Sequence, residues 1–156
     1  MIDTTNPPPS ASQVLKTLMQ VAGDGEALKA YLQSHLDDAV IGMVTPYLGL
    51  NKADTISRLH GLFAMARGGS ASLLAVVAER NSACGRVLLT SVKHDIATLK
   101  TLNTRTQKVF EGSLWLNLTP EGQIGVLGVV GDRLSPALAG GMVLLPPQKT
   151  PALATA

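Results

Sequence analysis

The chain has 156 residues, of which 46% are hydrophobic, 15% charged and only 3% aromatic, and its net charge is +2. This length suits one domain with an aliphatic core, and a lone cysteine excludes an intramolecular disulfide. The first ten residues contain one aspartate and three prolines, which argues against a signal peptide. Charged residues interrupt the most apolar stretch, 124–145, so no membrane-spanning helix is expected there. We therefore predict a cytoplasmic protein, and the composition suits a bacterial or phage source.

Two helices are expected before residue 46. Ser10 or Ser12 can cap the first, which carries a short apolar stripe. Asp24 caps the second, whose apolar residues follow helical spacing as far as Met43. Pro46 ends it, because the residue before a proline is pushed out of helical geometry.

A third helix begins after Asn51 or Asp54 and closes at the sequence RGG, 67–69. After it the hydrophobic period becomes that of strands. Residues 72–79 and the run that follows Gly85 predict a hairpin. Helical spacing then returns over 91–110, although its threonine-rich end can equally begin a strand near Thr104.

Three further strands complete the predicted order. They are SLWLNL at 113–118, QIGVLGVVG at 123–131 after a turn at TPEG, and GGMVLL at 140–145. The order α-α-α-β-β-α-β-β-β predicts an α+β fold: N-terminal helices, then a mainly antiparallel sheet of about five strands with one inserted helix. From the third helix onward this order resembles that of roadblock and longin-type domains, which are small dimerising scaffolds.

The domain limits follow from the same pattern. We expect a flexible proline-rich tail at 1–9 and a single domain at 10–146, with a helical part at 10–68 and a sheet part at 70–146. Residues 147–156 are expected to form a C-terminal tail.

The segment 122–131 has glycine at every third position. A dinucleotide site needs Gly-x-Gly-x-x-Gly at the start of a helix, and a P-loop needs Gly-Lys-Ser/Thr; neither pattern is present. Glycines within an apolar strand instead indicate bulges or close approach of another backbone. We therefore expect no nucleotide and no other cofactor.

Other motifs offer weak sites. The sequence RGGS, 67–70, can bind an anion but is more typical of a helix end. An enzyme of unrecognised type would use Cys84 or His94, but no family signature surrounds either residue. His35 and Asp38 share a helix face, and one such pair does not define a metal site. No catalytic residue and no metal are predicted.

Positive charge is concentrated in residues 52–108, which hold nine Lys or Arg against three Asp or Glu. Such a segment can attract phosphates, although few aromatic residues are available to stack on bases. A nucleic-acid-binding accessory protein is therefore the alternative function. Its expected contacts are Arg67, Arg80, Arg86, Lys93, Lys100 and Arg105.

Residues 112–148 hold only three charged side chains, and their strands are apolar on both faces. Because the helices suffice for one face of the sheet, we expect another subunit to cover the second. The expected interface is Leu114, Trp115, Leu116, Ile124, Val126 and Val129. The leading hypothesis is thus a non-enzymatic protein acting through protein–protein contacts: a self-associating scaffold, assembly or adaptor subunit, forming a homo-oligomer or larger assembly with no small-molecule substrate.

Overall fold

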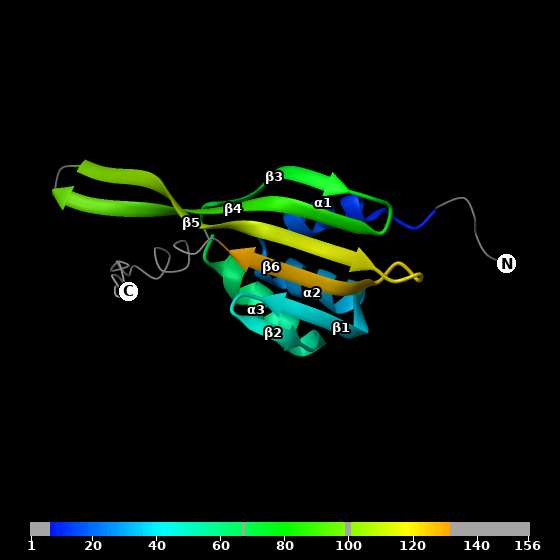
Figure 1. Ribbon diagram of the computed structural model, residues 1–156. Coiled ribbons are helices and arrows are strands. Elements are labelled where there is room, and N and C mark those ends of the chain that lie inside the picture. The colour runs from blue at the N-terminus through cyan, green and yellow to red at the C-terminus, as the bar shows by residue number, and fades with distance from the viewer. Residues whose placement is uncertain (1–6, 67, 99–100, 132–156) are drawn as a thin grey trace, which may run out of the picture.

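A computed structural model describes residues 7–66, 68–98 and 101–131, with side chains described outside 93–106. Six strands of the described chain form one sheet in the order β2-β1-β6-β5-β4-β3, and Figure 1 shows the helices gathered on one of its faces. The elements are α1 (Ala11–Val21), α2 (Gly25–His35), β1 (Leu36–Val44), β2 (Tyr47–Leu50), α3 (Lys52–Ala64), β3 (Ser70–Ala78), β4 (Ser82–Thr98), β5 (Thr101–Leu118) and β6 (Ile124–Gly131).

The predicted α+β class is confirmed, but the sheet is mixed. Neighbouring strands pair antiparallel except for β1 and β6, which run parallel. The predicted hairpin of β3 and β4 and the turn between β5 and β6 are both present. None of the described helices is long and apolar enough to cross a membrane.

Each helix begins at a side chain that accepts hydrogen bonds from the first turn. Ser10 accepts from the Gln13 amide, while the Gln13 side chain accepts from the Ser10 amide. The Asp24 side chain accepts from the Glu26 and Ala27 amides at the start of α2, and the Asn51 side chain accepts from the Asp54 amide at the start of α3. These three caps confirm the predicted helix starts.

The predicted second helix is too long. It ends at His35, and the next nine residues form β1, which lies between β2 and β6. The buried residues of β1 include Leu36, Val40 and Val44, spaced by four. A spacing of four residues fits one face of a helix and one face of a strand equally well, so periodicity alone does not separate them.

The helix predicted over 91–110 is absent. The chain there continues β4 and begins β5, and the two long strands form a ribbon that projects beyond the rest of the sheet (Figure 1). Threonine and β-branched residues favour strands, so the alternative of a strand near Thr104 is correct. Without the inserted helix, the resemblance to roadblock and longin-type domains does not hold.

The core lies between the helices and one face of the sheet. Helix α1 packs against β3, β4 and β5, and α3 packs against β1. The other face of the sheet, which we call the open face, carries no described helix (Figure 1). It exposes Ile41, Val77 and Val130. The strand predicted at 140–145 lies outside the described residues.

Gly125, Gly128 and Gly131 lie in strand β6, as predicted, whereas Gly122 lies in the turn before it. The pairing of β5 with β6 shifts register across Gly125, which agrees with a bulge, and the close neighbours of Gly128 and Gly131 are aromatic rings. A Cβ added at Gly128 would overlap the indole of Trp115, and one added at Gly131 would overlap the ring of Phe110. Both rings belong to β5, the neighbouring strand. The prediction that another backbone approaches here is therefore replaced by packing of side chains from the same chain.

Candidate functional site: the α3 pocket

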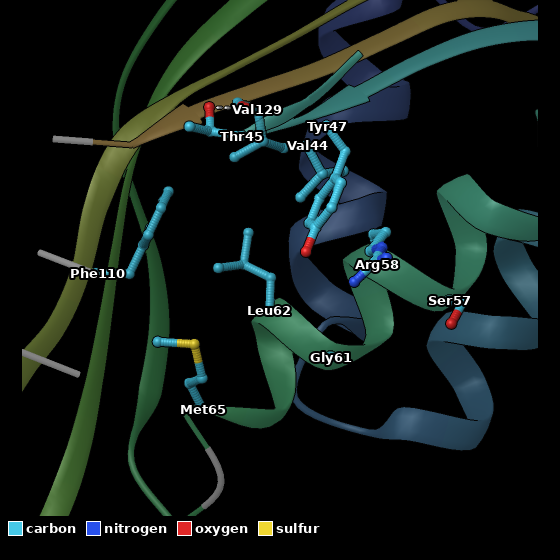
Figure 2. Close-up of a pocket in the computed structure, with 10 residues that line it drawn as sticks. All are labelled: Val44, Thr45, Tyr47, Ser57, Arg58, Gly61, Leu62, Met65, Phe110 and Val129. Carbon is cyan, nitrogen blue, oxygen red and sulfur yellow. Dashed lines mark hydrogen bonds between the residues drawn. The ribbon is translucent and has the colours of Figure 1, made fainter. Parts of the chain in front are cut away.

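A cavity of about 480 Å³ lies between α3 and the sheet, next to the ends of β1 and β6 (Figure 2). We call it the α3 pocket. Its floor is apolar and buried, formed by Val44 at 6% exposure, Phe110 at 3% and Val129 at 2%. Leu62 and Met65 form half-buried apolar walls. A ligand in this space would therefore lose contact with water over much of its surface.

Helix α3 supplies half of the lining from one face. Ser57, Arg58, Gly61, Leu62 and Met65 recur at intervals that place them along one side of the helix and its C-cap. The same helix buries Leu59 and Phe63 at another angle against the core. One amphipathic helix thus serves both the core and the pocket.

Gly61 is the unusual residue of this helix face. Glycine in a helix interior is less favourable than alanine by roughly 1 kcal/mol. A Cβ at this position would meet no atom within 4 Å, so packing does not require glycine here. The missing side chain instead leaves space at the edge of the pocket.

The aromatic floor residue also depends on glycines. An added Cβ at Gly112 or Gly131 would overlap the Phe110 ring. The two glycines, on β5 and β6, therefore let this ring lie flat against the sheet at the bottom of the pocket.

The rim of the pocket is polar. The Arg58 guanidinium carbon lies 3.7 Å from the centroid of the Tyr47 ring, a cation–π contact that contributes about 0.5–1 kcal/mol at an exposed site. Within the described residues, the Tyr47 hydroxyl donates no hydrogen bond and Arg58 forms no ion pair. Thr45 is held in place, because its amide and its Oγ1 both donate to the Val129 carbonyl oxygen at 3.0 Å.

The chemistry of the described lining is binding and charge stabilisation. No Asp, Glu, His, Lys or Cys is among the ten described lining residues. Likewise, no group of three His, Cys, Asp or Glu within the described ranges can hold a metal ion. The polar groups available to a ligand are therefore the guanidinium and the three hydroxyls of the rim.

Two ionisable groups with shifted pKa values lie away from the pocket. Burial raises the pKa of the Tyr31 hydroxyl, which donates to the Val14 carbonyl oxygen at 3.4 Å. Hydrogen bonds from Arg86 and then Lys108 lower the pKa of the Glu111 carboxyl. The Arg86 and Lys108 nitrogens lie 2.6 and 3.1 Å from its oxygens.

The six residues predicted as a subunit interface lie on both faces of the sheet. Four of them are part of the chain's own core, at 0–2% exposure, and cannot face a partner: Leu114, Leu116, Ile124 and Val129. Trp115 and Val126 are half-buried, and Trp115 lies on the open face, beside Gly128 and paired with Cys84. Strand alternation separates the two sets, because successive side chains point to opposite faces.

The predicted basic surface does not form one patch. Arg80 lies at the β3–β4 turn, whereas positions 93 and 105 lie in the projecting ribbon, roughly 40 Å away at about 3.3 Å per residue. Arg86 pairs with Glu111, which neutralises much of its charge. Arg67 and Lys100, and the side chains of Lys93 and Arg105, lie outside the described residues.

The remaining sequence candidates are not brought together. Cys84 is exposed on the open face of the sheet, and His94 lies on the same strand, roughly 30 Å further along at about 3.3 Å per residue. The His35 ring stacks on Tyr31, with ring centroids 4.0 Å apart, and its Nδ1 lies 2.8 Å from the Tyr31 carbonyl oxygen. The contacts of His35 are thus with its own helix, α2, which ends at this residue.

The sequence argument counted Arg58 in the basic segment 52–108 but did not select it as a site residue, and it missed the other polar residues of the pocket rim. Tyr47 and Arg58 come from β2 and α3, and neither lies in a motif. The one available signal was Gly61, a glycine within an amphipathic helix that nothing in the local sequence explains.

Solved structures share this fold at low sequence identity. A SnoaL-like polyketide cyclase from Agrobacterium tumefaciens is 12% identical, covers 81% of this chain and 94% of its own, and has a TM-score of 0.58. IdmH, a candidate polyketide cyclase from Streptomyces antibioticus, is 11% identical, covers 85% and 99%, and has a TM-score of 0.62. A de novo designed protein with a curved β-sheet is 11% identical, covers 84% and 92%, and has a TM-score of 0.58. At these identities the likeness shows the fold alone.

No sequence profile of a known family and no curated protein matches the chain. The structural likeness nevertheless corrects the functional prediction. The expected non-enzymatic scaffold, its nucleic-acid-binding alternative and the expected lack of a small-molecule substrate are contradicted, because the solved structures that share this fold include SnoaL-like polyketide cyclases and an isomerase. The expected homo-oligomer stays a prediction.

Proposed function

We propose that this protein is an enzyme that binds a small organic molecule with an apolar body in the α3 pocket. The observation that supports the proposal is the pocket itself, with a buried floor of Val44, Phe110 and Val129 under a polar rim. Its volume falls within the range of about 300–1,000 Å³ that is common for ligand sites. The names of solved proteins with this fold, which include polyketide cyclases, agree with a small organic substrate.

The described residues suit a reaction that depends on positioning. A flexible substrate held against Phe110 and Leu62 would lose conformational freedom before it reacts, which accelerates ring closure and isomerisation. The Tyr47 hydroxyl, at the rim and without an acceptor in the described chain, can donate to a substrate oxygen that gains negative charge. We therefore propose cyclisation or isomerisation of a carbonyl compound as the reaction class.

A variant that fills the pocket tests the proposal. Gly61→Leu adds a side chain where a Cβ meets no atom within 4 Å, so the protein should stay folded while the cavity becomes smaller. Gly23→Leu is the matched control, because Gly23 is also exposed, has similar space around its Cβ and lies outside the pocket.

The assay uses a panel of neutral aromatic and aliphatic ketones, with binding followed by calorimetry and conversion by mass spectrometry. Native protein and Gly23→Leu should bind and convert the same compounds, whereas Gly61→Leu should do neither. If Gly61→Leu behaves as the native protein does, or if no compound binds to the native protein, the proposed function is wrong.

A further inference from the structure

The two ends of the α3 pocket differ in polarity. Figure 2 shows Phe110 at one end and the Tyr47 ring beside Arg58 at the other, with Leu62 between them. The apolar end is buried, whereas Tyr47 is 43% exposed and Arg58 is also exposed. A ligand that fills the whole pocket would therefore place one end in a dry apolar environment and the other beside a cation.

The charge of Arg58 is not matched by the described protein. Lys52, nearly two turns earlier on α3, pairs with Asp38 at 3.1 Å. Asp54 stands four positions before Arg58, yet the described residues show no ion pair between them. No acidic residue is among the described lining of the pocket. The guanidinium is thus available to an anion from outside the chain.

The Tyr47 ring also holds the guanidinium in one place. Stacking at 3.7 Å restricts the long arginine side chain before any ligand arrives. Less rotamer freedom is then lost when the guanidinium forms hydrogen bonds. The Tyr47 hydroxyl gives the same end of the pocket a second donor.

We infer that the substrate of the α3 pocket is an amphipathic carboxylate, with its apolar body against Phe110 and Leu62 and its carboxylate on Arg58. The inference rests on the proposed function and specifies the substrate class. A planar carboxylate matches the two parallel N–H groups of one guanidinium, and its single charge matches the single cation of the rim. A phosphate monoester, with up to two charges, would leave one charge unmatched by the described rim.

The test compares 2-naphthoate with its neutral methyl ester, which has the same ring system. Native protein should bind the acid about tenfold more tightly than the ester. A buried arginine–carboxylate pair would give a larger preference, but Arg58 is exposed and water screens its charge. Arg58→Gln should remove this preference and leave the ester affinity unchanged. Arg58→Lys should keep part of it, because lysine retains the charge but not the planar fork.

Arg80→Gln is the matched control, since Arg80 is an exposed arginine outside the pocket. The Arg80→Gln protein should prefer the acid over the ester as strongly as the native protein does. Salt near 1 M, where the Debye length is about 3 Å, should weaken acid binding and spare the ester. Circular dichroism of each variant checks that it is folded.

The outcomes separate this inference from the proposed function. If the acid and the ester bind equally to the native protein, or if Arg58→Gln retains the preference, the substrate is not a carboxylate while the proposed function stands. If Gly61→Leu binds both probes as the native protein does, the probes lie elsewhere and the proposed function is wrong. Failure of both probes to bind the native protein contradicts both.

Discussion

The contact between Gly128 and Trp115 leads to a prediction about stability. Gly128 on β6 lies directly opposite Trp115 on β5, and an added Cβ would overlap the indole. Positive φ values among the described glycines are confined to positions 49, 68 and 122, so alanine is conformationally allowed at 128. Gly128→Ala is therefore expected to act through the ring, not through the backbone.

The expected magnitude follows from two opposing effects. Replacing a glycine at an unstrained position stabilises a protein by roughly 0.4–1 kcal/mol, because the unfolded chain loses freedom. Overpacking costs about 1–3 kcal/mol, and the Trp115 ring lies half-buried on a face without helices, where it can tilt away. We expect a net loss of about 1 kcal/mol in the free energy of unfolding.

A double-mutant cycle isolates the contact. In a Trp115→Leu background the overlap is removed, so Gly128→Ala should become neutral or stabilising, with a coupling of about 1–2 kcal/mol between the two positions. Urea unfolding followed by circular dichroism measures all four proteins. Because the chain has one tryptophan, a red shift of its emission in Gly128→Ala would report the tilt.

Stabilisation by Gly128→Ala in the presence of Trp115 would refute this reasoning. So would a coupling below about 0.3–0.5 kcal/mol, which is the range for independent sites. Either result would mean that the indole does not depend on the missing side chain of Gly128.

Three further predictions concern helix α3 and the ion pairs of the sheet. Asn51→Ala removes the acceptor of the Asp54 amide, 2.8 Å away, and should lower the free energy of unfolding by about 1 kcal/mol in a urea titration; an unchanged midpoint would mean that the cap contributes nothing. Gly42→Ala brings a Cβ into the side chain of the fully buried Thr55 and should cost about 1–3 kcal/mol by the same measurement, whereas a more stable protein would contradict the close packing of α3 on β1. Arg86 and Lys108 lower the pKa of Glu111 from 4.5, so the carboxylate stabilises the fold above that pH and the stabilisation disappears as the pH falls through the lowered pKa. The difference in Tm between native protein and Glu111→Gln should therefore be largest near neutral pH and vanish in acid, and a difference that is constant with pH would show that the charge plays no part.

Local signals in the sequence predicted the parts of the fold that local interactions stabilise. The three caps at Ser10, Asp24 and Asn51 were found because each side chain bonds amides within three residues of itself. The β3–β4 hairpin and the turn before β6 were found because turn residues separate two short apolar runs. The α+β class followed from these elements.

The secondary-structure predictions are wrong where the local residue pattern fits both a helix and a strand. Leu36, Val40 and Val44 suit a helix until β6 pairs with the segment that contains them, and that parallel pairing joins positions 85 to 88 residues apart. The threonine-rich stretch near Thr104 likewise becomes a strand because β4 pairs with it. For a related reason, four of the six predicted interface residues lie in the core, since apolar residues on both faces of β5 do not reveal which face the chain's own helices cover.

The sequence by itself determined where the helices begin, which segments are apolar and that the last three glycines of the series lie in a strand, because those properties depend on residues close together in the chain. Only the tertiary structure decided which apolar residues enter the core and where a cavity remains. The α3 pocket joins Thr45 to Val129, which are 84 positions apart, and sets Arg58 beside Tyr47 at its rim. Hydrophobic periodicity cannot predict this pocket, because the pocket arises from the packing of α3 against strands that meet only in the folded sheet.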